Sequence, residues 1–374
     1  MKSLNIIYQT CLLLLFTTLN IPKVDAIPNL DQTVRTVKIG LLITDNKAVA
    51  AKNGAEMAIR IANEKGGCNG HPFELIVRSM EGPWGTGAKE AVNMVFKHEV
   101  WAIIGSADGR NAHLIEQVTA KSHTVFLSAW SGDPTLSQAF VPWYFSCVPN
   151  FNQQALVLVD EIYQKQNFSR VGLVYDNEYE SQSALKCFLK RTKLAGKADP
   201  VQFSFNESDT DPNNLLDKIE MADIQCLTLF LKPASALKVI QQIRQKKKDI
   251  PVFSTLSLLN ENEVPINELR SISNGIRITS SQWQKSQSNS FNDEFQKRFA
   301  FLPGTVAAYA FDGMNLLIEA VRKAGSDRGK VQKIMSEIHQ EGVTGPIQFD
   351  DKGNRTGAVV LMEIKNGIVV IPER

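Results

Sequence analysis

Short apolar runs alternate with amphipathic helical patterns from residue 37 onward. Residues 37–43, apolar apart from Lys38, are typical of a buried strand, and residues 53–64 place apolar side chains on one helical face. Gly66 and Gly67 then end the predicted helix. Further strands at 73–80, 100–104 and 124–128 are separated by helical patterns. We therefore predict βαβ units, with a parallel sheet and helices on both of its faces.

A second series of the same kind follows a break at residues 142–150. It predicts helices at 152–166, 182–194, 213–222 and 234–245, and strands at 170–175, 201–205, 226–231 and 252–255. The tail predicts helices at 291–299, 306–323 and 330–339, and strands at 347–349, 358–364 and 368–371. Because this tail is too long to be one more βα unit, we expect it to cross back and complete the first domain.

The first 26 residues have the pattern of a secretory signal. Lys2 precedes a mostly apolar stretch at residues 4–19, and Val24 and Ala26 occupy the positions that a signal peptidase reads. A transmembrane anchor is the alternative, but a spanning helix needs about 20 apolar residues. We therefore predict cleavage after Ala26 and export to the periplasm.

Composition narrows the class of protein. The 374 residues are 43% hydrophobic, and 41 basic and 39 acidic side chains leave a net charge of +2. The length predicts two domains, and the charge makes no case for nucleic acid as a partner. Four cysteines follow the signal: Cys68, Cys147, Cys187 and Cys226. One or two disulfides can form in an oxidising compartment, whereas the apolar run around Cys226 favours a buried free thiol.

Sequence templates for catalysis do not fit. Residues 82–89 resemble a phosphate-binding loop, but the lysine comes one residue late and Glu90 replaces the Ser or Thr that would hold magnesium. A Gly-rich turn between strand and helix is the better interpretation. Ser106 lies one position too early for a nucleophile elbow, and the five histidines form no i, i+4 pair. We predict no enzyme activity, no metal site and no cofactor.

Polar residues gather where the predicted parallel strands end. Ligands of open parallel sheets bind outside these carboxyl ends, and the hydroxyls, backbone NH groups and Trp130 found there suit capture of a small polar molecule. A role in a helix cap or a turn is the alternative for each residue. The candidate ligand-binding residues are Ser106, Asp108, Gly109, Ser128, Trp130, Ser131, Gly132, Tyr179 and Ser257.

The segment at residues 53–70, NGAEMAIRIANEKGGCNG, resembles the first helix and turn of the type I periplasmic binding proteins that serve branched-chain amino-acid transporters. Segments at 102–105, 127–136, 171–176, 308–313 and 345–353 are similar to later parts of this family, in the same order. The resemblance implies two Rossmann-like α/β lobes joined by a three-crossover hinge, which closes on the ligand. The implied lobes are residues 36–149 plus 279–350, and residues 150–278 plus 351–374.

Members of this family deliver a small solute to a membrane permease and carry out no chemistry. The resemblance therefore implies the extracytoplasmic solute-binding protein of an ABC importer, which binds an amino acid, an amide or a related compound. We expect a monomer whose partners are that solute and the permease. A ligand-sensing module of the same fold, which reports to a membrane receptor or signalling protein, is the alternative.

The family's ligand contacts match this chain only in part. Members that bind amino acids have two hydroxyl residues where this chain has Asp108 and Gly109, and their acidic partner of the ligand amine falls near Ser257. Tyr179 matches an aromatic contact from the second lobe. Asp108 would repel a carboxylate unless Arg110 compensates. We therefore hypothesise that the ligand is not a standard branched-chain amino acid.

Overall fold

The computed structural model describes residues 36–370, except residues 107, 207–211, 247–248, 273, 282–288 and 367. The predicted signal and its cleavage point lie outside the described residues. Thr36–Arg374 form one compact unit, and every helix and strand named below belongs to it. Among the residues that the structure describes, no helix is long and apolar enough to cross a membrane.

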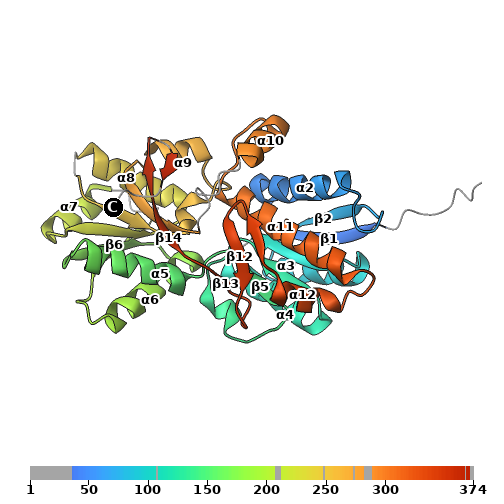
Figure 1. Cartoon of the computed structure of the whole chain (residues 1–374). Helices are drawn as coiled ribbons and strands as arrows, with labels where there is room; N and C mark the ends of the chain where they lie inside the picture. Colours follow the sequence, from blue (N-terminus) through green and yellow to red (C-terminus); the bar gives the residue numbers. More distant parts are fainter. Residues whose placement is uncertain are drawn as a thin grey trace, which may run out of the picture. The chain divides into compact units, whose positions relative to one another are not determined.

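The first lobe is the five-stranded sheet together with the helices that cover it. Its strand order is β2-β1-β3-β4-β5, and all neighbouring strands are parallel (Figure 1). The strands are β1 (Val37–Ile43), β2 (Phe73–Ser79), β3 (Ala102–Ser106), β4 (Val125–Ser128) and β5 (Tyr144–Ser146). The helices are α2 (Val49–Glu64), α3 (Thr86–Val92), α4 (Gly109–Ser122), α11 (Thr305–Ala324) and α12 (Lys330–Glu337). A π-helical segment (Asn93–Lys97) continues α3, and a short 3₁₀ helix (Pro134–Ser137) follows β4.

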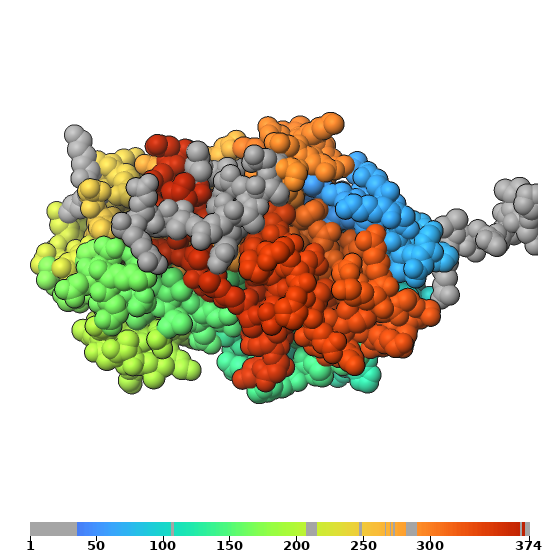
Figure 2. All heavy atoms as spheres, viewed as in Figure 1, coloured from blue at the N-terminus to red at the C-terminus, as the bar shows by residue number. Residues whose placement is uncertain are grey.

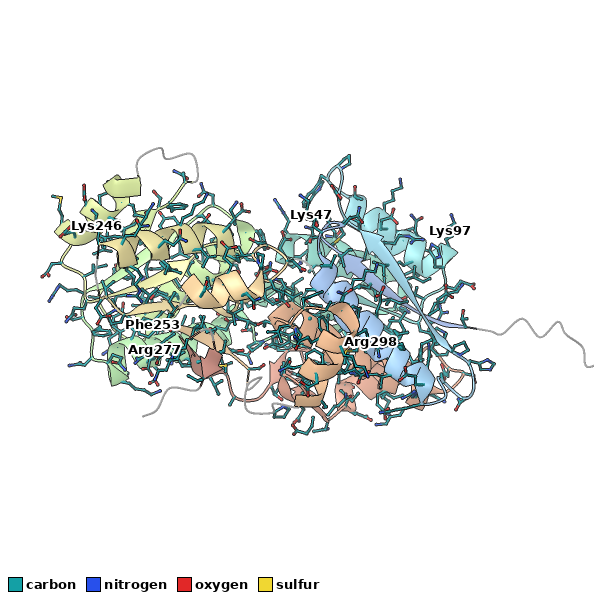
Figure 3. The ribbon with its side chains drawn as sticks, turned by 90° about the horizontal axis from the view of Figure 1, so that it is seen from above. Lys47, Lys97, Lys246, Phe253, Arg277 and Arg298 are labelled. Carbon is teal, nitrogen blue, oxygen red and sulfur yellow. The ribbon has the colours of Figure 1, made fainter. Side chains whose placement is uncertain are left out.

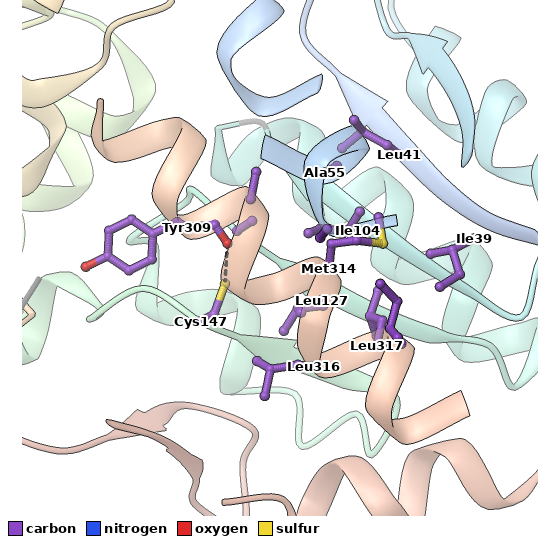
Figure 4. Packing of buried hydrophobic residues seen from close by; sticks show 14 of the residues in the cluster. Ile39, Leu41, Ala55, Ile104, Leu127, Cys147, Tyr309, Met314, Leu316 and Leu317 are labelled. Carbon is purple, nitrogen blue, oxygen red and sulfur yellow. Dashed lines mark hydrogen bonds between the residues drawn. The ribbon is translucent and has the colours of Figure 1, made fainter. Parts of the chain in front are cut away.

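Apolar side chains of this sheet alternate between two cores on its opposite faces. Ile39, Leu41 and Leu127 pack with α2 and α11, as Figure 4 shows. The intervening Leu42 and Phe126 pack in a separate cluster with residues of α3 and α4. Because both faces are covered, β1 and β4 are buried almost throughout, which explains why both strands are mostly apolar.

Helix α11 confirms that the tail returns to the first lobe. It packs along α2, and the segments coloured orange in Figure 2 accordingly lie beside the blue N-terminal part. Gly54 permits this close approach, because a Cβ atom there would lie 2.2 Å from the carbonyl oxygen of Ala307. At the far end of the core, the Cys147 thiol donates to the carbonyl oxygen of Tyr309 at 3.8 Å (Figure 4).

The second lobe is the seven-stranded sheet with its helices, in the order β15-β14-β10-β9-β8-β6-β7. The parallel strands are β6 (Val171–Tyr175), β7 (Val201–Ser204), β8 (Cys226–Phe230), β9 (Val252–Ser254) and β10 (Ile276–Ser280). The tail adds β14 (Val360–Lys365) and β15 (Ile368–Val370) as antiparallel strands at the β10 edge. Arg277 on β10 lies over the Phe253 ring on β9, 6.0 Å from the ring centroid (Figure 3).

In the described part of the chain, five α-helices accompany this second sheet. They are α5 (Phe151–Val159), α6 (Tyr179–Leu194), α7 (Pro212–Met221), α8 (Pro233–Gln245) and α9 (Ile266–Ile272). A π-helical segment (Asp160–Lys165) continues α5, and a 3₁₀ helix (Leu256–Leu259) follows β9. Helix α10 (Asn289–Phe299) follows β10 and leads back to α11.

Three chain segments cross between the lobes, after β5, after β10 and after β13. The third starts from a small antiparallel sheet of β11 (Gln340–Gly342), β12 (Gly345–Phe349) and β13 (Arg355–Thr356). The buried Arg355 side chain donates to the carbonyl oxygens of Cys147 at 2.8 Å and Thr344 at 2.9 Å. The Gln153 amide donates back to the Arg355 carbonyl oxygen at 2.9 Å. Arg355 therefore ties the first crossover to the third, and the α/β fold with a three-crossover hinge is confirmed.

Several details differ from the predictions. Helices α2 and α6 begin at Val49 and Tyr179, one turn earlier than periodicity indicated, and β10 was not predicted. The predicted helix at 330–339 is wrong in its last residues, because α12 ends at Glu337 and β11 begins at Gln340. Cys68, Cys147, Cys187 and Cys226 are all free and buried, so the free-thiol alternative holds for each. The residue boundaries assigned to the lobes stay a prediction.

Candidate functional site

The N-terminus of α4 lies at the carboxyl end of β3, and Asp108 caps it. The Asp108 carboxylate accepts a hydrogen bond from the Asn111 backbone NH at 2.8 Å. Its other oxygen lies 3.8 Å from the Arg110 guanidinium, so the expected compensating cation is in place. Ser106 ends β3, two positions before the cap, and its side chain is not among the described ones. Asp108 therefore stabilises the N-terminus of α4 at this edge of the sheet.

The turn after β4 brings Ser131, Gly132 and Asp133 to the same edge. The Asp133 backbone NH donates to the Ser131 hydroxyl oxygen at 3.1 Å, and the Thr135 backbone NH donates to the Asp133 carboxylate at 2.9 Å. Only 1% of Ser131 and 3% of Asp133 is exposed. The turn is therefore a rigid, buried polar element rather than an open loop.

Asp133 is the centre of a buried charge cluster. His113 Nε2 lies 3.5 Å from its carboxylate, and the Tyr179 hydroxyl donates to it at 2.8 Å from the second lobe. Burial alone would raise the pKa of Asp133, but hydrogen bonds from His113, Thr135 and Tyr179 lower it to about 2. Hydrogen bonds to Asp133 and Glu116 raise the pKa of His113 to about 9, against the effect of burial. His113 and Asp133 therefore form an ion pair at neutral pH.

Glu180 reaches from α6 of the second lobe into the first. Its Oε1 accepts from the Gly109 backbone NH at 2.6 Å and from the Ser131 hydroxyl at 2.8 Å. Its Oε2 accepts from the Gly132 backbone NH at 3.3 Å. Burial raises the pKa of Glu180 to about 7, against these hydrogen bonds, which lower it. One carboxyl group thus joins α6 to the ends of β3 and β4.

A second set of contacts joins the loop after β9 to two other helices of the first lobe. The Glu261 carboxylate accepts from the backbone NH groups of Val306 and Ala307, each at 2.8 Å, in the first turn of α11. The Asn262 amide oxygen accepts from the Ala50 backbone NH at 3.2 Å, in the first turn of α2. Second-lobe oxygens therefore meet the N-termini of α2, α4 and α11, where unpaired NH groups and the helix dipole favour acceptors.

The structure brings part of the predicted set together. Gly109, Ser131, Gly132 and Tyr179 meet around Glu180 and Asp133, as described above. Ser128 is buried at the end of β4, and Trp130 is half-buried against the first-lobe core. Ser257 is half-buried on the 3₁₀ helix after β9, and these three residues take no part in the contacts given above.

Sequence reasoning missed Glu180, Asp133, His113 and Glu261. The signal that could have found Glu180 is its position beside Tyr179 in the first turn of a helix at a strand end. Among the described residues, no group of three His, Cys, Asp or Glu side chains is arranged to hold a metal ion. The Gly-rich segment before α3 is a turn, as interpreted, because Gly82 and Gly85 adopt φ values of 140° and 93°.

Comparison with known proteins decides the family. The family model for periplasmic binding proteins matches residues 36–367. The chain belongs to this family. Periplasmic binding proteins are extracytoplasmic substrate-binding proteins and not enzymes, so both the recognition of the family and the expectation of no enzyme activity are confirmed.

Individual members of the periplasmic binding protein family are distant from this chain. It is 23% identical to a Leu/Ile/Val-binding protein homologue of Brucella melitensis over 332 residues, 85% of this chain and 86% of that protein. The fold is similar to that of the substrate-binding protein LivJ of Streptococcus pneumoniae in complex with isoleucine, with a TM-score of 0.78, 21% identity and coverage of 90% and 98%. A solute-binding protein of R. palustris in complex with benzoate has a TM-score of 0.77, 17% identity and coverage of 90% and 95%.

Proposed function

We propose that this periplasmic binding protein captures a small polar solute between its two lobes and delivers it to the permease of an ABC importer. The observation that carries the proposal is the polar contact between the lobes. Second-lobe oxygens of Glu180, Glu261 and Asn262 accept hydrogen bonds at the N-termini of three first-lobe helices. When the lobes separate, water can replace these hydrogen bonds, so opening costs less than exposure of an apolar interface of the same size would.

The distant relatives support the transport role. Three of them are named for Leu/Ile/Val, isoleucine or benzoate as the bound compound, and each of these compounds carries a carboxylate. In this chain, polar donors of the first lobe are taken by a carboxylate of the protein itself. This supports the hypothesis that the solute is not a standard branched-chain amino acid. An amide or a related polar compound carries no carboxylate that would compete with Glu180 for these donors.

The candidate contact residues are proposed as a set at the strand ends of both lobes. From the first lobe, Gly109, Ser131 and Gly132 belong to the set as the residues whose donors hold Glu180 at the strand ends. Trp130 supplies an aromatic wall, because it follows β4 directly and is half-buried. Tyr179 contributes from the second lobe. Ser106, Asp108, Ser128 and Ser257 lie at the ends of β3, β4 and β9 and complete the set.

The test is a thermal-shift screen of the mature chain, beginning at Ile27, against amino acids, primary amides and small polyols, followed by calorimetry on every hit. A solute that binds only the folded chain stabilises it by about 2.7 kcal/mol at a hundred times its dissociation constant. Reconstitution with the permease then separates import from the alternative of a ligand-sensing module. Tight binding of leucine would refute the proposed solute class, and a bound solute that no permease imports would favour sensing.

A further inference from the structure

Glu180 occupies a cradle of three donors that the first lobe presents to the second. The Gly109 NH, the Ser131 hydroxyl and the Gly132 NH converge on its two oxygens at 2.6, 2.8 and 3.3 Å. The donors come from two separate loops, after β3 and after β4, so the cradle is more than the end of one helix. Donors of this kind make their strongest hydrogen bonds with carboxylates.

Two glycines shape the cradle. A Cβ atom on Gly109 would lie 2.6 Å from the Asp133 carboxylate and 2.9 Å from the Tyr179 ring. A Cβ atom on Gly132 would lie 2.8 Å from the Phe151 ring. Both positions therefore exclude a side chain, and their NH groups stay accessible to an acceptor from the second lobe. The cradle is built for a group that arrives from outside the first lobe.

The surroundings of the cradle are acidic. Burial is the main cause of the raised pKa of Glu180, and the negative charges of Asp133 and Asp108 on the first lobe raise it further. The Tyr179 hydroxyl donates a hydrogen bond to Asp133 Oδ2, and His113 forms its ion pair with the same oxygen. An additional carboxylate placed here would lie beside Glu180 and would find its donors already occupied, whereas Arg110 and His113 partly balance the charges of Asp108 and Asp133.

We propose that Glu180 is an internal occupant of a carboxylate-binding cradle and determines specificity by excluding solutes with a free carboxylate. The proposal deepens the proposed function and rests on it. A solute that carries a carboxylate can use the Gly109, Ser131 and Gly132 donors only by displacing Glu180 together with the end of α6. A neutral or cationic solute does not compete for these donors and is therefore selected.

The experiment uses acetate as the probe, because acetate consists of a carboxylate and a single methyl group. In Glu180→Ala the cradle is vacated, and ¹³C-acetate titrated by NMR is expected to bind with a dissociation constant in the low millimolar range. The wild-type chain is expected to bind acetate at least tenfold more weakly. Adding Ser131→Ala to Glu180→Ala removes one donor and is expected to weaken acetate binding about fivefold to tenfold.

Glu180→Gln is the matched control, because the amide keeps the volume of the side chain and blocks the cradle without a charge. It is expected to bind acetate as weakly as the wild type. Glu180→Ser is a second vacating variant, used if Glu180→Ala fails to fold by circular dichroism. The proposal is overturned if a folded vacating variant binds acetate no more tightly than the wild type, or if Ser131→Ala leaves that binding unchanged.

The acetate titration separates this inference from the function it rests on. It requires no knowledge of the natural solute, so a failed solute screen leaves its outcome intact. Conversely, acetate binding by the wild type as tight as that by Glu180→Ala would refute the role of Glu180 while leaving solute capture between the lobes untouched.

Discussion

Arg355 offers the sharpest test of how the crossovers are held together. Its side chain is only 4% exposed and donates six hydrogen bonds to five acceptors. The acceptors are the carbonyl oxygens of Cys147, Thr344, Gly345 and Pro346 and the hydroxyl oxygen of Thr344. These groups belong to the first crossover and to the small antiparallel sheet that precedes the third.

Arg355→Lys keeps the positive charge but has only three donors, so at least two of the five acceptors lose their partner. Each buried acceptor without a partner costs about 1–3 kcal/mol, so two of them predict a loss of about 2–6 kcal/mol in the free energy of unfolding. Urea denaturation followed by circular dichroism measures this loss directly. The corresponding fall in melting temperature is on the order of 5–10 °C.

Arg60→Lys is the matched control. Arg60 lies on the outside of α2, its side chain is 46% exposed, and its guanidinium is 3.8 Å from the Glu64 carboxylate. Exchanging this surface residue should change the free energy of unfolding by less than about 0.5 kcal/mol. If Arg355→Lys changes the free energy of unfolding as little as Arg60→Lys does, the hydrogen bonds of Arg355 do not hold the two crossovers together.

Three further changes test the site. Trp130→Ala should weaken solute binding about tenfold with the fold intact, because it removes an aromatic wall. An unchanged affinity in calorimetry would show that the solute does not contact Trp130. His113→Gln should cost about 1 kcal/mol of stability, since the ring is one-third exposed, and the cost should depend on pH. Because the pKa of His113 is raised to about 9 in the folded chain, protonated His113 stabilises the fold fully below about pH 6.5, and this stabilisation is lost as the pH rises through 9. Because the pKa of Asp133 is lowered to about 2, ionised Asp133 stabilises the fold above about pH 4, and this stabilisation is lost as the pH falls toward 2. Urea unfolding should therefore separate wild type and variant most at pH 5–6 and least at pH 10; an equal gap at both would contradict the ion pair. Glu261→Gln should cost about 1 kcal/mol through loss of a charged acceptor at the α11 N-terminus, and a variant as stable as the wild type in thermal unfolding would show that the contact contributes nothing.

The helices and strands could be predicted well wherever burial imposes a regular pattern of apolar residues. Strands β1, β3 and β4 are mostly apolar because the sheet is covered on both faces. Helix α11 has a clear apolar pattern because it packs against both the sheet and α2. The return of the tail to the first lobe could be inferred from its length. Strand β10 was missed because Arg277, which packs over Phe253, interrupts its apolar pattern.

The polar cluster at the sheet edge could be predicted only to the level of strand ends. Gly109, Ser131, Gly132 and Tyr179 were singled out because a parallel sheet places such residues at one edge, and their contact with a solute stays a prediction. Glu180 was not found, because an acidic residue in the first turn of a helix ordinarily satisfies that helix's own NH groups. Its contacts with Gly109, 71 positions earlier, depend on how α6 and α4 come together, which no local pattern encodes.

Small-angle X-ray scattering of the mature chain, with and without a solute whose binding calorimetry has verified, tests the central claim most directly. Capture between the lobes predicts a smaller radius of gyration and a narrower distance distribution when the solute is bound, because closure brings the second-lobe oxygens onto the helix N-termini of the first lobe. Identical scattering profiles with and without the bound solute would contradict hinge closure.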